Sequence, residues 1–256
     1  MKLFDRLQRF GVTASDNRLD YWNYQVQIGR YYHEYFVSPY SDGKKILDVG
    51  CGEGGVLSVF ENQGYACTGL EYSAERAQFA RNETRGKSPI IHGDIQQFSS
   101  SEKFDVILIL DVIEHVPDKE AALNNMIRLL APGGIIVVSF PPFRSPFGGH
   151  QQVMRSWLKF AVYVHLLARP MYRWLLTYVE KQHIAMHLSN YDTGVTMKRF
   201  EALVQQAQLQ ILRKEMYLVR PRQAFRFHLK IRKYRLRFLR EFLCSGIVYI
   251  LKPRET

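Results

Sequence analysis

The chain has few cysteines and no long apolar run. Its three cysteines, Cys51, Cys67 and Cys244, are too few and too far apart for a disulfide framework, and no CxxC pair suggests a zinc site. The longest apolar stretch, residues 160–168, is much shorter than the roughly 20 residues needed to cross a bilayer. The first residues lack the apolar core of a signal peptide. We therefore expect a cytoplasmic protein without a transmembrane helix.

Acidic residues are scarce in the second half of the chain. Residues 1–150 carry 15 basic and 18 acidic side chains, whereas residues 151–256 carry 20 and 6. Residues 220–240 contain nine basic side chains and no acidic one, interleaved with aromatic and aliphatic residues. This asymmetry predicts that the second half of the chain meets something anionic.

The 256 residues are 46% hydrophobic, enough for a sizeable core, which excludes a disordered or fibrous protein. Between residues 45 and 141, short apolar runs alternate with stretches of helical period, as in βαβ units with a parallel sheet. We expect a doubly wound α/β fold with a helical insertion after the fifth strand. Its seven strands are expected at residues 46–49, 66–70, 90–91, 104–110, 135–140, 209–218 and 244–251.

Helix signals lie between these strands. One helix is expected at residues 56–63, and others begin at Ser73, at Pro117-Asp118 and at Thr196, each of which supplies a start signal. The Pro132-Gly133-Gly134 sequence is expected to end the third of these helices. The basic segment 219–241 is expected to connect the last two strands.

A glycine-rich turn follows the first strand. The GxGxxG pattern formed by Gly50, Gly52 and Gly55 lies where the strand passes into a helix, so the backbone can turn sharply and approach a ligand. Glu71 ends the second strand about 20 residues later, where a carboxylate can accept both hydroxyls of a ribose. The two features together predict a cofactor that contains ribose.

Asp48 distinguishes between the two candidate cofactors. A carboxylate just ahead of the glycines would repel the pyrophosphate of a nicotinamide dinucleotide, but it suits the cationic amino acid end of S-adenosylmethionine. The alternative is that Asp48 hydrogen-bonds the amides of the turn. S-adenosylmethionine is therefore the favoured cofactor, and a nicotinamide oxidoreductase is the least favoured class.

Several motifs give the chain a specific resemblance. It resembles the class I S-adenosylmethionine-dependent methyltransferases, most closely the small-molecule branch that includes ubiquinone-biosynthesis methyltransferases. The motifs occur in that family's order and spacing over about residues 40–142. They are Leu47-Asp48-Val49-Gly50-Cys51-Gly52, Gly69-Leu70-Glu71, Gly93-Asp94-Ile95, Leu110-Asp111-Val112-Ile113-Glu114-His115-Val116 and Leu130-Ala131-Pro132-Gly133-Gly134. The resemblance also implies that the last two strands form an antiparallel hairpin.

The resemblance assigns roles to the cofactor-binding residues. It implies that Gly50 and Gly52 approach the methionine portion, that Glu71 binds the ribose, and that Asp94 and Ile95 contact the adenine. Leu110 and Asp111 are expected beside the cofactor at the end of the fourth strand. Two simpler interpretations stay open: Asp94 as a turn residue and Glu71 as a helix cap.

His115 is the candidate general base for a hydroxyl acceptor, with Asp111 beside it as a second catalytic candidate. His115 could instead be structural. We expect no metal, although Asp111, Glu114 and His115 are similar to an E-x-x-E-H motif that binds a divalent ion in some members. A further histidine, His150 or His187, would complete a Mg²⁺ site in that alternative.

Residues 141–190 are expected to shape the substrate pocket. Phe143, Phe147 and His150 are the candidate substrate-binding residues, on a lip that Gly148 and Gly149 make mobile. Residues 157–179 mix aromatic and basic side chains, which is typical of an amphipathic helical pair, here broken at Pro170. Such a pair lies on a bilayer or covers a bulky apolar substrate. The alternatives are a cap packed on the sheet and a dimer contact.

The basic segment 220–240 fits an anionic lipid surface better than RNA, because the chain contains no recognisable RNA-binding module. A solvated segment without a partner is the third interpretation. The aromatic segment 21–36 either covers the cofactor as a lid or packs on the sheet.

We interpret the chain as one methyltransferase domain that acts on an oxygen of a small molecule, a lipid or a lipid-linked glycan, with access to the inner membrane surface. An RNA methyltransferase and a non-catalytic cofactor-binding subunit are the alternatives. The parts of the domain are a helical lid at 1–44, a cofactor-binding core at 45–140, a substrate-side insertion at 141–190, and a helix, strand pair and basic segment at 191–256.

Overall fold

The computed structural model describes residues 18–236 and 238–254, so residues 1–17 of the expected lid lie outside it. Within the described residues one sheet has the strand order β3-β2-β1-β4-β5-β8-β6-β7. The strands are β1 Lys45–Val49, β2 Ala66–Glu71, β3 Ile90–His92, β4 Phe104–Leu110, β5 Leu130–Phe140, β6 Leu209–Val219, β7 Arg232–Lys233 and β8 Gly246–Pro253. β1 to β5 are parallel, whereas β8, β6 and β7 each pair antiparallel to their neighbour. The doubly wound α/β prediction and the antiparallel final pair are confirmed.

The predicted strand count was wrong by one. β7 consists of Arg232 and Lys233 alone and pairs with the outer edge of β6, inside the expected connection 219–241. A pair of basic residues gives no strand signal, because strands are recognised by their buried, alternating side chains. The same connection also forms the short helices α9, Pro221–Phe227, and α10, Arg240–Leu243.

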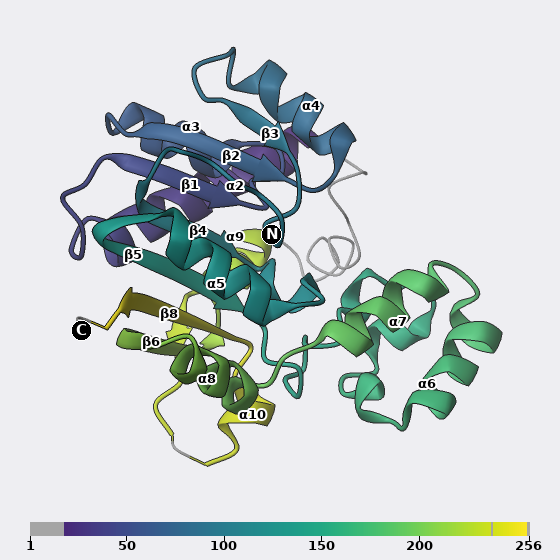
Figure 1. The fold of residues 1–256 in the computed structure, drawn as a ribbon. Helices are drawn as coiled ribbons and strands as arrows, with labels where there is room; N and C mark the ends of the chain where they lie inside the picture. The colour runs from purple at the N-terminus through teal and green to yellow at the C-terminus, as the bar shows by residue number, and fades with distance from the viewer. Residues whose placement is uncertain (1–17, 237, 255–256) are drawn as a thin grey trace.

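Two layers of helices cover the sheet (Figure 1). One face packs against α2 (Arg18–Tyr32), α3 (Gly55–Asn62) and α4 (Ala74–Glu83), and the other packs against α5 (Lys119–Leu129) and α8 (Met197–Gln206). Neighbouring strand residues alternate between the two cores, so Val106 and Leu108 join one core and Ile107 and Ile109 the other. The central strands are apolar on both faces because both faces are covered.

Three predicted helix starts are confirmed by their caps. The side chains of Ser73, Asp118 and Thr196 each accept a hydrogen bond from a backbone N–H in the first turn of α4, α5 and α8. The helix α5 stops at Leu129, shortly before the Pro132-Gly133-Gly134 sequence, as expected. The following strand begins earlier than predicted, so this sequence lies in β5, where pairing with β4 loses its regular register.

The insertion forms a separate lobe beside the sheet, with α6 (Arg169–Leu175) and α7 (Ile184–Thr193) around a small core of its own (Figure 1). Pro170 does not break a helical pair; it lies in the first turn of α6, where a missing N–H costs nothing. The segment before it, residues 157–166, forms short 3-10 turns. No helix among the described residues is long and apolar enough to span a membrane.

The two glycines of the expected mobile lip are tightly packed. A Cβ atom on Gly148 would lie 2.2 Å from the Phe143 carbonyl oxygen, and one on Gly149 would lie 2.2 Å from the His165 ring. His165 also bonds the Phe143 carbonyl through Nε2 at 2.6 Å. These glycines therefore allow two segments of the chain to pack closely. The sequence had instead predicted that they make the lip mobile.

Candidate functional site

A cavity of about 580 Å³ opens at the carboxyl ends of the parallel strands. This is the edge at which open α/β sheets bind ligands, and the volume suits a small molecule. Its lining comes from the loops after β1 to β4 and from α2, the insertion lobe and the segment after β6. The predicted site residues among the lining are Asp48, Gly50, Glu71, Asp94, Ile95, Leu110, Asp111, His115, Phe147 and His150.

Asp48 and Gly50 form the part of the site at the end of β1. Gly50 adopts φ +74°, and a Cβ there would lie 2.3 Å from Val112 Cγ2, so glycine is required by both conformation and space. Asp48 is buried, and its Oδ2 has no hydrogen-bond partner among the described residues. Burial, aided by the nearby Glu71 carboxylate, raises the pKa of Asp48 to about 8. The absence of amide partners for Oδ2 favours a ligand role over a turn role.

Glu71 ends β2 with both carboxylate oxygens anchored. Oε2 accepts the Gly52 N–H and Oε1 accepts the Ser73 N–H, each at 2.9 Å. Each oxygen has a second lone pair, so this buried carboxylate can still accept a ligand hydroxyl. Gly52 does not line the cavity; a Cβ there would lie 2.4 Å from Arg76 Nη2 and 2.6 Å from Gln25 Nε2. Its N–H instead fixes the orientation of Glu71.

Asp94 combines the two roles considered for it. Its Oδ1 accepts the Gln96 N–H at 2.9 Å and its Oδ2 accepts the Gln96 side-chain amide at 2.8 Å, which is a turn arrangement. Asp94 and the buried Ile95 nevertheless both line the cavity. The loop after β3 therefore presents a carboxylate next to an apolar side chain.

Asp111 forms two ion pairs in the site. Its Oδ1 accepts from Arg220 Nη1 at 2.7 Å and its Oδ2 accepts from Arg222 Nη1 at 2.8 Å. Burial raises the pKa of Asp111, but the two guanidinium groups outweigh burial and bring it to about 2. Asp111 also adopts φ +57°, a conformation uncommon for a residue other than glycine. Its predicted catalytic role stays a prediction, since a carboxylate held this way is a poor proton acceptor near neutral pH.

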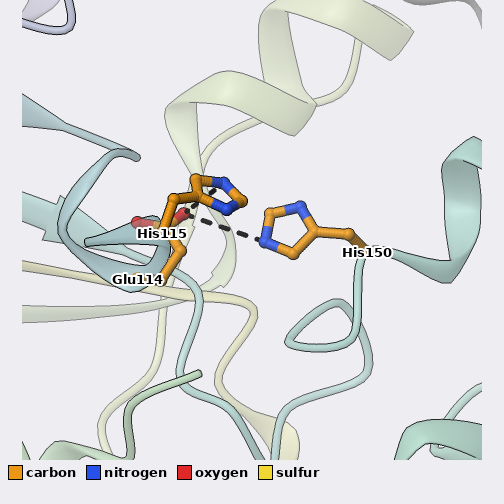
Figure 2. A group of neighbouring side chains, drawn as sticks. All are labelled: Glu114, His115 and His150. Atoms are coloured by element: carbon orange, nitrogen blue, oxygen red, sulfur yellow. Dashed lines mark ion pairs between the residues drawn. The ribbon is translucent and has the colours of Figure 1, made fainter. Parts of the chain in front are cut away.

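Glu114, His115 and His150 form a cluster beside this ion pair (Figure 2). The Glu114 Oε1 atom lies 3.9 Å from Nε2 of each histidine, and the two imidazole rings are 4.7 Å apart. Burial raises the pKa of Glu114 to about 8, and Asp111 adds to the shift. His115 Nδ1 lies 3.0 Å from Asn190 Oδ1, so its proton is assigned to Nδ1 and the lone pair to Nε2.

The structure changes the set of candidate metal ligands by one residue, from Asp111 to His150. Within the part of the chain that the structure describes, the group with ligand atoms within 4.8 Å of one another consists of Glu114, His115 and His150, whereas Asp111 is occupied by the two arginines. His187 is fully buried in the insertion lobe, outside this group. Phe143 does not line the cavity either, because its ring packs against His165 and Tyr191.

Several residues that line the cavity were not predicted from the sequence to lie there. Arg220 and Arg222 were expected on a lipid-facing or RNA-facing surface, yet they point to Asp111. Gly246 was the sequence signal that could have indicated the position of Arg220, because a Cβ on Gly246 would lie 2.4 Å from Arg220 Cδ. The helix α2 packs on α3, as one interpretation of segment 21–36 expects, and it also lines the cavity. That it covers the cofactor as a lid stays a prediction. Its lining residues are Tyr21, Tyr24, Gln25, Ile28 and Tyr32.

The ion pair of Asp111 predicts a stability that depends on pH. The folded-state pKa of about 2 lies below the ordinary value of 3.8, so its stabilisation is complete above pH 4 and is lost as pH falls toward 2. The loss of free energy of unfolding in Asp111→Asn should be about 2 kcal/mol at pH 6 and should shrink between pH 4 and pH 3. Urea unfolding at each pH measures it. A difference that stays constant over this range would contradict the assigned ion pair.

Comparison with known proteins identifies the family. A family profile described as a methyltransferase domain matches residues 16–212. The ubiquinone biosynthesis O-methyltransferase of Klebsiella pneumoniae subsp. pneumoniae is 32% identical over 102 residues, covering 38% of this chain and 42% of that protein. The enzyme of the same name from Pasteurella multocida is 37% identical over 114 residues, covering 38% and 46%. The matched segment thus spans less than half the length of these two relatives.

Solved structures agree in fold. The plantazolicin methyltransferase BamL superposes with a TM-score of 0.57 at 16% identity, covering 93% of this chain and 88% of that one. The PH0226 protein from Pyrococcus horikoshii OT3 superposes with a TM-score of 0.59 at 15% identity, covering 93% of both chains. The resemblance to class I S-adenosylmethionine-dependent methyltransferases is confirmed: the chain belongs to the methyltransferase domain family.

Proposed function

We propose that this protein transfers a methyl group from S-adenosylmethionine to an oxygen of a small molecule, a lipid or a lipid-linked glycan. The observation that carries the proposal is the convergence of Asp48, Glu71 and Asp94 on one cavity from the ends of three adjacent strands. The ubiquinone-biosynthesis relatives, named as O-methyltransferases, support oxygen as the acceptor atom.

The residues present fit this cofactor. The unpartnered, buried Oδ2 of Asp48 suits a cationic amino group, which would also restore the ionised carboxylate. Glu71 can accept the ribose hydroxyls, and Asp94 with Ile95 can take a planar base that carries an amine. The structure of the distant fold relative BamL contains SAH, and that of the glycopeptide N-methyltransferase MtfA contains S-adenosylmethionine.

We assign the removal of the acceptor's proton to His115, which lines the cavity. Its Nε2 carries the lone pair, and desolvation lowers its pKa below 6.5 although 41% of the side chain is accessible, so the ring is neutral at pH 7. The acceptor hydroxyl gives its proton to Nε2 while its oxygen bonds to the methyl carbon, whose bond to sulfur breaks. The cofactor supplies an activated sulfonium methyl, so positioning of the acceptor accounts for much of the rate.

A metal-assisted transfer is the second candidate. Glu114, His115 and His150 bring their ligand atoms within 4.8 Å of one another, and neither Glu114 oxygen has a hydrogen-bond partner among the described residues. Two imidazoles and one carboxylate suit a transition metal such as Zn²⁺ better than the Mg²⁺ considered from the sequence. A metal here would hold an acceptor oxygen and lower its pKa.

We also propose peripheral contact with anionic membranes. The insertion lobe exposes Trp157, Trp174 and Tyr178, and the basic segment exposes Phe238 and Leu239. The lobe contacts the helix α10 that follows the basic segment, because the Tyr163 hydroxyl in the lobe donates to the Phe242 carbonyl at 2.8 Å. Exposed aromatic side chains next to basic ones are typical of surfaces that bind the membrane interface.

Removal of the Glu71 carboxylate should weaken cofactor binding. Each charge-assisted hydrogen bond to a ribose hydroxyl contributes about 1.5–3 kcal/mol, so Glu71→Ala should reduce affinity roughly tenfold or more. Isothermal titration with S-adenosylhomocysteine measures the change. Glu83→Ala, at an exposed glutamate of the adjoining helix α4, is the matched control and should bind normally. Equal affinities for the two variants would contradict the assignment of Glu71.

Replacement of His115 should slow turnover and spare cofactor affinity. His115→Ala should lower the rate roughly 10²–10⁴-fold, and the acidic limb of the wild-type pH profile should lie below pH 6.5. Transfer of labelled methyl to fractions of a cell extract measures the rate and shows whether label enters lipid, glycan, RNA or protein. Unchanged turnover would remove His115 from the mechanism.

The same assay separates the remaining candidates. Loss of activity with a chelator and its return with Zn²⁺ favour the metal-assisted transfer over a simple base. Label in RNA favours the RNA methyltransferase, and normal cofactor binding without any labelled product favours a non-catalytic subunit.

Sedimentation with vesicles tests the membrane contact. The wild type should pellet with phosphatidylglycerol vesicles and stay in solution with phosphatidylcholine vesicles. A double variant, Trp157→Ser with Trp174→Ser, should pellet several-fold less, because both indoles are more than half exposed and contribute little to the fold. Equal pelleting by the wild type and the double variant would contradict the proposed surface.

A further inference from the structure

Most of the charged residues that line the cavity are separated according to strand order. Asp48 lies in β1, Glu71 ends β2 and Asp94 follows β3, in one half of the sheet. In the other half, the segment after β6 contributes Arg220, Arg222 and Arg226 to the lining, and the first two bond Asp111 at the end of β4. The first group is the part assigned to the cofactor, which leaves the second group for the acceptor.

Two guanidinium groups share one carboxylate in the acceptor half. Arg220 and Arg222 each bond one oxygen of Asp111, so these three side chains carry a net charge of +1. These three side chains therefore keep an excess positive charge in the lining of the cavity.

Both arginines are fixed in position with donor capacity to spare. Arg222 donates Nη2 to the Tyr21 hydroxyl at 2.7 Å and lies 6.0 Å and 5.9 Å from the ring centroids of Tyr21 and Tyr24. Arg220 is only 8% exposed, and its Nε–H has no hydrogen-bond partner among the described residues. A buried N–H donor left unpaired costs free energy that a bound acceptor atom would recover. A guanidinium presents five donors, and Asp111 uses one from each arginine.

We propose that the methyl acceptor carries an anionic group, a carboxylate or a phosphate, and that Arg220 and Arg222 bind it. This inference rests on the proposed function, which assigns the acidic half of the cavity to the cofactor. Guanidinium groups match the planar oxygens of carboxylates and the faces of phosphates with paired hydrogen bonds. Binding the anion would turn the rest of the acceptor toward His115, which lines the same cavity.

Anion binding can be measured without turnover. The full-length protein, saturated with S-adenosylhomocysteine, is titrated with inorganic phosphate, with 3-hydroxybenzoate and with the neutral 3-hydroxybenzamide. The two anions should bind at least about tenfold more tightly than the amide, as charge-assisted hydrogen bonds predict. Equal binding of benzoate and benzamide would overturn the proposal. Repeating the titrations without S-adenosylhomocysteine keeps the anion result separate from any failure of cofactor binding, which would count against the proposed function instead.

Two substitutions should act in opposite directions. Arg222→Gln lowers the net charge of the three side chains to zero and should weaken anion binding roughly tenfold, whereas Asp111→Asn raises it to +2 and should strengthen binding. The double variant restores +1 and should bind nearly as the wild type does, which separates charge from damage to the fold. Arg232→Gln, at an exposed position on β7, has the same change in total charge and should bind normally. Weaker binding in Asp111→Asn would contradict the proposal.

The labelled methyl product identifies the source of the anion. On an anion-exchange column at pH 7 the product should be retained, and prior treatment with a phosphatase should abolish retention if the group is a phosphate monoester and leave it unchanged if it is a carboxylate. A product that passes through the column untreated would overturn the proposal while leaving methyl transfer itself intact.

Discussion

The carboxylate of Asp111 joins parts of the molecule that are more than one hundred residues apart. It sits at the end of β4, in the middle of the sheet, and its two arginines come from the segment that follows β6. β6 runs antiparallel to β8, and β8 runs antiparallel to β5, so β6 ends at the same edge as the parallel strands. Asp111, Arg220 and Arg222 therefore form part of the cavity wall at that edge. Without the terminal hairpin, the acceptor half of the site would lose one of its walls.

This arrangement explains how a mostly ordinary α/β core gains a specific pocket. The parallel strands β1, β2 and β3 supply the carboxylates of one half, and the added strands bring cations to the other half. The strained conformation of Asp111, the close packing of Gly50 against Val112 and the passage of Arg220 over Gly246 all occur at this edge. Local strain and tight packing are thus concentrated where ligands are expected to bind.

The sequence predicted those features that depend on local pattern. Continuous apolar runs located the central strands, and Ser73, Asp118 and Thr196 located helix starts, because strand burial and caps are both encoded by neighbouring residues. Asp48, Glu71 and Asp94 were found because each lies at or near the carboxyl end of a strand. Arg220 and Arg222 were misplaced, since a run of basic residues gives no sign of which ones turn inward. Asn190, the partner of His115, lies 75 residues away and has no local signal.

A crystal structure with bound S-adenosylhomocysteine would show which half of the cavity holds the cofactor. We expect the ribose on Glu71, the adenine beside Asp94 and Ile95, and the amino group on Asp48, with Arg220 and Arg222 still bonded to Asp111 and free of the nucleoside. A nucleoside bound against the two arginines, with Glu71 bonded only to Gly52 and Ser73, would contradict the division of the cavity into a cofactor half and an acceptor half.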